Sequence, residues 1–234
     1  MRLLTPAHAN AKTAKNGDET ISYILHMAPA KLSGWNTCPA ASSGCAQACL
    51  NTAGRGRFQS TQDARIWRTV LYYQNPTVFM DVLYADLNTA VKAGRRLGKQ
   101  VVVRLNGTSD LDWRAVIRDY PTIQFYDYTK LLSHLADQLR DPLPNYDLTF
   151  SRSEDNDRAC ARALSLGFRV AVVFKDDLTT ILAKHQWASM HYMGASVIDG
   201  DGTDLRYKEP GGVIVALKAK GKARKDQSGF VVSI

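Results

Sequence analysis

The chain has 234 residues, of which 45% are hydrophobic and 22% charged, a composition typical of a globular protein with one core. Its formal net charge is +8, and no stretch is long and apolar enough for a membrane-spanning helix. These features argue against a disordered or membrane-spanning protein, and they predict a single domain over residues 1–234 in the cytoplasm.

Segments rich in β-branched and aromatic residues recur along the chain, as expected for strands. They lie at 20–27, 100–107, 122–128, 146–153, 168–174, 195–200 and 212–219. Amphipathic patterns predict helices at 60–74, 76–99, 109–120, 129–140, 153–167 and 176–186. The middle strands start every 22 to 24 residues, the interval of βα units around a parallel sheet. We therefore expect an α/β fold, an incomplete and open barrel of the TIM type, because about six units are recognisable and about eight are needed for closure.

Three cysteines lie close together after the strand at 20–27. Cys38, Cys45 and Cys49 are separated by six and three residues, and the small residues between them allow the segment to wrap an inorganic centre. Thiols stay reduced in the cytoplasm, so a disulfide framework is not expected. Structural zinc sites usually use two pairs of closely spaced ligands, and no second pair of cysteines is present here. Three thiolates therefore favour an iron-sulfur cluster, which would be 4Fe-4S with one open iron or 3Fe-4S.

Two alternatives to a cluster stay open at this point. One is zinc, completed by a remote ligand such as His26 or Cys160. The other is a set of thiols without metal. Cys160 itself lies on a predicted amphipathic helix, where a buried core residue is the better explanation.

Polar residues gather where the predicted strands end, which is the active face of βα folds. The candidates for binding a cofactor or substrate are Arg104, Asn106, Asp110, Tyr126, Lys130, Ser151 and Arg152. Strand alternation points Arg104 and Asn106 into the barrel, where an arginine needs a partner such as Asp110 or Asp127. The pattern leaves open whether that pair is structural or holds a ligand, and it identifies no catalytic residue.

A basic segment at 218–228 holds Lys218, Lys220, Lys222, Arg224 and Lys225. Such a run attracts the phosphates of nucleic acid. A solvated tail, or an edge strand protected by lysines, is an equally good interpretation.

Several motifs, in order, resemble the gene product 88 family of phage proteins over about residues 5–175. They are LHMAPAKLSGWNTCPAASSGCAQACLNTAGRGRF, ARIWRT, VVVRLNGTSDLDW, FYDYTK and LTFSRSEDN. The resemblance implies a phage protein acting in an infected host cell. The cysteine loop ahead of βα units also resembles radical S-adenosylmethionine enzymes, which implies Cys38, Cys45 and Cys49 as ligands of a 4Fe-4S cluster. The loop is wider than in those enzymes, so the resemblance implies cluster binding more directly than S-adenosylmethionine binding.

Two functions follow from these patterns. The first is an iron-sulfur protein that performs redox or radical chemistry on an unknown small-molecule or host partner. The second is a binding module without enzymatic activity, stabilised by a cluster or zinc, that contacts nucleic acid through its basic segment or binds a host protein. The sequence leaves open whether the protein is an enzyme.

Overall fold

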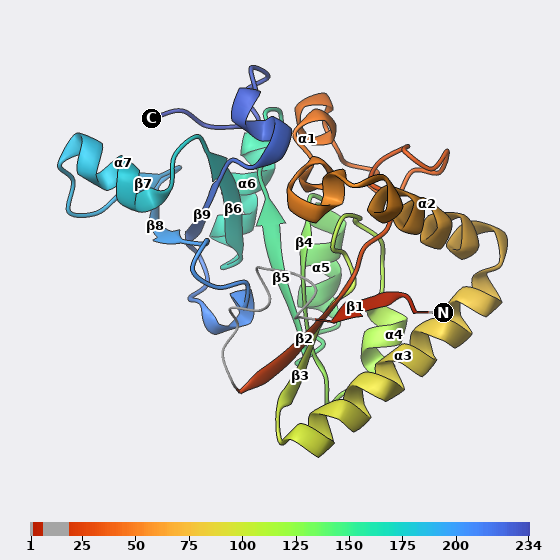
Figure 1. Cartoon of the computed structure of the whole chain (residues 1–234). Coiled ribbons are helices and arrows are strands. Elements are labelled where there is room, and N and C mark those ends of the chain that lie inside the picture. The colour runs from red at the N-terminus through yellow and green to blue at the C-terminus, as the bar shows by residue number, and fades with distance from the viewer. Residues whose placement is uncertain (1, 7–18) are drawn as a thin grey trace.

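The computed structural model describes residues 2–6 and 19–234, and it has a mixed α/β fold around one nine-stranded sheet (Figure 1). The strands are β1 (Leu4–Pro6), β2 (Thr20–Leu25), β3 (Gln100–Arg104), β4 (Gln124–Thr129), β5 (Tyr146–Ser151), β6 (Arg169–Phe174), β7 (His191–Tyr192), β8 (Ala195–Asp199) and β9 (Ile214–Lys218). Their order in the sheet is β1-β2-β3-β4-β5-β6-β9-β8-β7. Pairing is parallel from β2 to β8 and antiparallel only at the two edges, where β1 and β7 are added.

The helices between the strands have the expected order. They are α1 (Ser43–Gln47), α2 (Gln59–Gln74), α3 (Pro76–Leu97), α4 (Arg114–Asp119), α5 (Leu132–Arg140), α6 (Asp157–Ser165) and α7 (Leu178–His185). Short 3-10 helices are η3 (Leu50–Thr52), η4 (Gly54–Arg57), η5 (Arg206–Lys208) and η6 (Gly221–Lys225). Pro76 occupies the first turn of α3, where its missing N–H costs no hydrogen bond. No helix in the described residues is both long and apolar enough to cross a membrane.

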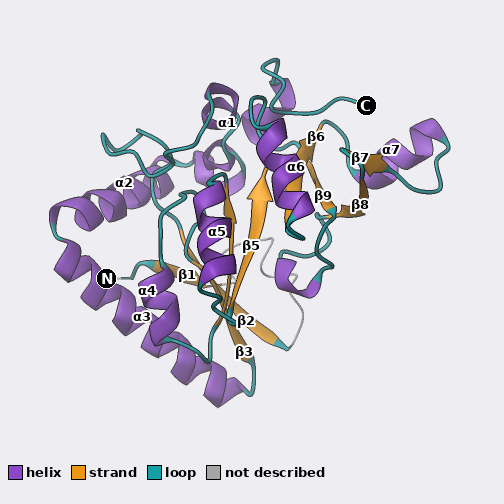
Figure 2. Ribbon diagram, turned by 180° about the vertical axis from the view of Figure 1, so that it is seen from behind, coloured by secondary structure: helices purple, strands orange, loops and turns teal. Residues whose placement is uncertain are grey.

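Alternate residues of each strand separate the two faces of the sheet. Val103, Phe125 and Phe150 belong to the main core, and Figure 2 shows α4, α5 and α6 over that face. On the opposite face, Val102 and Tyr126 pack with Leu205, next to η5. The segment after β8 therefore covers the face of the sheet that the helices leave free.

The α/β class and the predicted strands are confirmed, with ends shifted by a few residues. Two short edge strands, β1 and β7, were not predicted, because three and two residues are too few to show an alternating pattern. The cysteine segment consequently follows the second strand of the sheet and not the first. Helix α4 begins only at Arg114, since residues 109–113 form a loop held by hydrogen bonds to Asn106.

Candidate metal centre

The three cysteines lie on the segment after β2, at the end of the sheet where the parallel strands finish, hereafter the carboxyl end. Figure 2 shows the arrow of β5 pointing towards the side on which α1 lies. Hydrogen bonds tie the segment to the loop after β3: the N–H of Asp110 donates to the carbonyl of Thr37 at 2.8 Å. The hydroxyl of Thr108 donates to the carbonyl of Met27 at 2.5 Å. The cysteine segment therefore crosses the end of β3.

A second anchor joins the middle of the cysteine segment to the loop after β5. The carboxylate of Glu154 accepts from the hydroxyl of Ser42 and from the N–H of Gly44, both at 2.7 Å. Ser42 in turn caps α1, because its hydroxyl accepts from the N–H of Cys45 at 3.1 Å. Glu154 thus fixes the short helix that carries Cys45.

The first and last cysteines have their own contacts. The thiol of Cys38 donates to the carbonyl of Thr108 at 3.5 Å. Cys49 begins η3, and its sulfur accepts from the N–H of Asn51 at 3.5 Å. The side chain of Asn51 also donates to Gln62 at 2.6 Å and accepts from Arg65, both on α2. Helix α2 therefore supports the end of the segment.

The three sulfurs share one electrostatic environment. Burial raises the pKa of each thiol, that of Cys49 to about 11. Cys38 and Cys45 raise the pKa of Cys49 further by their charges, and Cys45 does the same to Cys38, so the sulfurs lie within electrostatic range of one another. Two cations act in the opposite direction, Lys130 on the pKa of Cys45 and Arg65 on that of Cys49. Both cations favour the thiolate form of the cysteines.

Within residues 2–6 and 19–234, no three His, Cys, Asp or Glu side chains converge closely enough to hold one metal ion. A cluster is itself several atoms across, so its cysteine ligands stand further apart than those of one zinc ion. Burial raises the pKa of all three thiols, whereas a cysteine nucleophile needs a lowered pKa.

Lys130 and Ser151 lie next to the cysteines at the ends of β4 and β5. The ammonium of Lys130 donates to the hydroxyl of Ser151 at 2.7 Å and lies 5.6 Å from the ring centroid of Phe230. Cys45 packs against the small apolar cluster that contains Phe230, and the charge of Lys130 opposes the rise in the pKa of Cys45. The structure thus brings these two predicted residues together with one of the three cysteines.

Arg104 and Tyr126 lie on the face of the sheet opposite the helices. Both contact Asp204, with the guanidinium of Arg104 at 3.7 Å and the Tyr126 hydroxyl at 3.0 Å. Arg104 also lies over the ring of Tyr128, 4.5 Å from its centroid. Asp110 and Asp127 were the expected partners of Arg104, and that pairing is wrong. Asp204 comes from the segment after β8, and its position depends on how that segment folds back over the sheet.

Asn106, Asp110 and Arg152 have structural contacts. Asn106 lies beyond the end of β3, and its side-chain oxygen accepts from Ser109, Leu111 and Trp113. Asp110 accepts from the N–H of Lys130 at 2.8 Å and pairs with His134 at 3.4 Å. Arg152 pairs with Asp157 at 2.9 Å and donates to the carbonyl of Gly229 at 2.9 Å, which attaches the C-terminal segment to the sheet.

The two remote candidates for a zinc ligand have other surroundings. His26 follows β2, and burial together with the charges of Arg65, Arg104 and Arg68 lowers its pKa to about 3. Cys160 is fully buried on α6, where its thiol donates to the side chain of Asn156 at 3.4 Å. The core position expected for Cys160 is confirmed.

Sequence reasoning missed three side chains of this region. Glu154 lies in the LTFSRSEDN motif, but nothing local marks it as the anchor of the cysteine helix, because its partner Ser42 is 112 residues away in the chain. Arg65 and Arg68 stand three apart on α2, the spacing of one helix face, and Arg65 is buried. That spacing could have indicated that the two arginines lie on the same face of α2.

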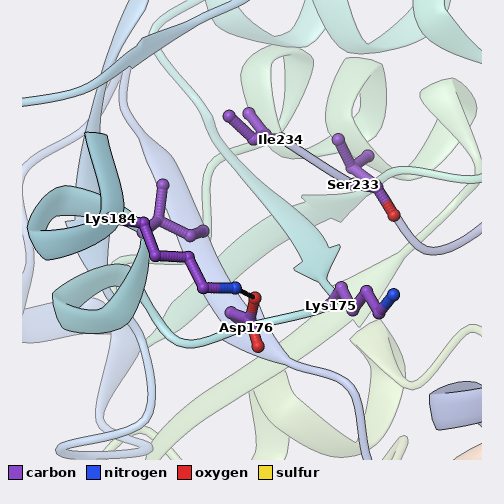
Figure 3. A pocket seen from close by; sticks show the side chains of 7 residues that line it. Lys175, Asp176, Lys184, Ser233 and Ile234 are labelled. Carbon is purple, nitrogen blue, oxygen red and sulfur yellow. Dashed lines mark hydrogen bonds and ion pairs between the residues drawn. The ribbon is translucent and has the colours of Figure 1, made fainter.

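A separate pocket lies beside α7. Figure 3 shows its lining residues, which are Lys175, Asp176, Ile181, Lys184, Val232, Ser233 and Ile234. The ammonium of Lys184 pairs with Asp176 at 2.5 Å, so these charges satisfy each other. None of the cysteines lines this pocket.

Comparison with protein families identifies the chain. The family model described as gene product 88 matches residues 2–234, almost the whole chain. The protein belongs to the gene product 88 family. The resemblance noted in the cysteine and strand-end motifs is thereby confirmed and extended to the C-terminal residues 176–234. No curated protein and no solved structure matches this member of the gene product 88 family.

Proposed function

We propose that Cys38, Cys45 and Cys49 hold an iron-sulfur cluster of the 4Fe-4S type, at the carboxyl end of an incomplete βα barrel. The observation that carries the proposal is the placement of three thiols from one segment, within electrostatic range of each other, across the ends of β3 and β5. A 3Fe-4S cluster fits the same three ligands. Zinc is the alternative metal, and it would need a fourth ligand from outside the cysteine segment.

The barrel interpretation is supported by the strand order. From β1 to β6 the spatial order equals the chain order, as it does in barrels of βα units. The face opposite the helices carries Val102, Arg104 and Tyr126, and it is filled by the segment around Leu205. This arrangement, with a cysteine loop after an early strand, is the basis for proposing a radical S-adenosylmethionine-like architecture.

The chemistry proposed for this protein is redox or radical chemistry on a bound substrate. When bound, a cluster with three cysteine ligands supplies one iron that is open to another molecule. The chain's own residues would orient that molecule: Lys130 offers a cation beside Cys45, and Arg65 offers one beside Cys49. The three cysteines are half-buried, so the centre would stay accessible to a substrate from solvent.

The test is anaerobic purification followed by elemental analysis and visible absorbance. We expect about four irons per chain with the broad visible band of a cluster, and loss of both in Cys45→Ala. Cys160→Ala is the matched control, since that thiol lies in the core, and it should keep the iron. Colourless protein with one zinc per chain would overturn the cluster. Cleavage of S-adenosylmethionine by the reduced protein would test the radical part separately.

A second candidate function is nucleic-acid binding, for which the basic segment 218–228 gives a specific observation. Two of its lysines are engaged: Lys218 pairs with Asp177 at 2.8 Å and Lys220 with Asp201 at 2.6 Å. Lys222, Arg224 and Lys225 on η6 are exposed instead. The N–H of Lys222 donates to the hydroxyl of Thr52 at 3.3 Å, so η6 lies against the end of the cysteine segment.

Salt-dependent DNA binding separates this function from the first. We expect the triple variant Lys222→Gln, Arg224→Gln, Lys225→Gln to lower the slope of log affinity against log salt by about three. The matched control neutralises the exposed Lys92, Arg95 and Arg96 on α3 and should leave the slope unchanged. If both triple variants lowered the salt slope equally, DNA binding would depend only on the net charge of the protein.

A further inference from the structure

Three arginines gather around His26 where β2 ends. Arg65 and Arg68 come from α2, and Arg104 is the last residue of β3. A guanidinium N–H of Arg68 donates to the carbonyl of His26 at 3.4 Å. All three cations act on the His26 ring, which burial and their charges keep neutral by lowering its pKa to about 3. Positive charge is therefore concentrated at one place beside the cysteine segment.

These arginines have few anionic partners in the described part of the chain. Arg65 is only 7% exposed, and its guanidinium donates to the amide oxygen of Asn51, which is neutral. The charge of Asp86 raises the pKa of Arg68, but the Asp86 carboxylate accepts from the N–H groups of Leu3 and Leu4. Arg104 alone has an ion pair, with Asp204 at 3.7 Å.

The same three arginines also have hydrogen-bond donors without an acceptor. The Nε atoms of Arg65, Arg68 and Arg104 are buried and have no hydrogen-bond partner among the described residues. The nearby hydroxyl of Tyr128, whose ring lies under Arg104, is also buried without one. Each guanidinium has a partner through another nitrogen, so the unmet hydrogen-bonding capacity lies at the Nε atoms. His26, Arg68 and Arg104 are partly exposed.

We propose that this group is a binding site for a small anionic molecule, whose phosphate or carboxylate group is held by Arg65, Arg68 and Arg104. Guanidinium groups match both anions in geometry, because two parallel N–H groups meet two oxygens. The neutral ring of His26 adds one N–H donor. An oxyanion here supplies the acceptors that the three Nε atoms lack.

The site determines which molecule would meet the metal centre. Arg65 donates to the side chain of Asn51, whose backbone N–H donates to the sulfur of Cys49, so this arginine connects the anion site to the cysteine segment. An anion bound there would hold the remainder of its molecule at the carboxyl end of the sheet. The reaction of the bound molecule rests on the proposed function, whereas the binding of the anion at the three arginines does not.

The experiment is titration of the purified protein with inorganic phosphate, followed by thermal unfolding and calorimetry, with chloride at the same ionic strength as reference. We expect phosphate to raise the unfolding temperature above the chloride reference. Arg65→Gln with Arg68→Gln should weaken phosphate binding about ten-fold or more. The matched pair Arg158→Gln with Arg162→Gln, both exposed on α6, should leave it unchanged. Acetate and adenosine monophosphate as further probes distinguish a carboxylate from a phosphoryl ligand.

Wild-type protein alone suffices to overturn the inference, even where the arginine variants do not fold. If phosphate, acetate and adenosine monophosphate all stabilise it no more than chloride does, the site does not exist. Equal affinity in the Arg65, Arg68 variant and in its control would overturn it as well. Cys45→Ala separates the two proposals, because it should lose the cluster and keep phosphate binding.

Discussion

Asp127 gives the sharpest prediction about stability. It lies on β4, is 1% exposed, and accepts from the N–H of Asn106 at 2.7 Å and from the hydroxyl of Tyr146 at 3.4 Å. Burial raises the pKa of its carboxyl from 3.8 to about 7, the charge of Asp110 adds to the rise, and Arg104 opposes it. The folded protein therefore keeps this carboxyl protonated at pH values at which the unfolded chain has lost the proton.

The sign of the effect follows from proton linkage. Between the unfolded pKa of 3.8 and the folded pKa of about 7, the folded state binds more protons, so the free energy of unfolding falls as pH rises. The contribution is fully present below pH 3.8 and is lost as pH rises through about 7. At about 1.4 kcal/mol per pKa unit, the loss over that window is about 4 kcal/mol.

Asp127→Asn isolates this contribution, because the amide keeps an acceptor for Asn106 and does not titrate. We expect the difference in unfolding free energy, wild type minus variant, to decrease by about 4 kcal/mol between about pH 4 and about pH 8. Urea unfolding at several pH values measures it. Asp81→Asn, at an exposed carboxylate on α3, is the control and should show a constant difference. A constant difference for Asp127→Asn as well would refute the reasoning.

Three further substitutions test the cysteine segment and its surroundings. In Gly44→Ala the new Cβ would lie 2.2 Å from the Ser228 hydroxyl and 2.7 Å from the Glu154 carboxylate. Chemical denaturation should therefore show a loss of about 1–3 kcal/mol in the free energy of unfolding. Adding Ser228→Ala should relieve part of that loss, because it removes the clashing hydroxyl. Glu154→Ala removes both anchors of α1 and should lower metal affinity about 10-fold or more in a chelator competition, while Asp155→Ala should not. Cys160→Ala should cost about 1–2 kcal/mol of unfolding free energy without changing iron content, and a loss of iron would make it a ligand.

The strands and helices were predictable because their signals are local. Phe125 and Val103 alternate with polar or opposite-facing neighbours along short strands, and Pro76 marks the first turn of α3. Cys38, Cys45 and Cys49 stood out for the same reason, since three thiols in a dozen residues need no knowledge of the fold to be noticed. The gene product 88 motifs are local as well, and the family match confirms them.

Contacts between distant segments were not predictable from these signals. Asp204 replaces the expected Asp110 or Asp127 beside Arg104, because the segment after β8 folds back over the sheet. Glu154 holds the cysteine helix from 110 residues away. The sequence pattern around Arg104 or Glu154 predicts neither contact, because the partner of a charged side chain depends on which distant segment packs next to it in the folded protein.

The sequence by itself determined the α/β class, the βα rhythm and the cysteine triplet, because spacing along the chain encodes each of them. Only the tertiary structure decided that Arg65 on α2 reaches Asn51 beside Cys49, and that the charges of Arg65, Arg68 and Arg104 all act on His26. The physical reason is that like charges gather only where packing of the surrounding elements holds them. Such a concentration of cations is a property of the folded chain as a whole.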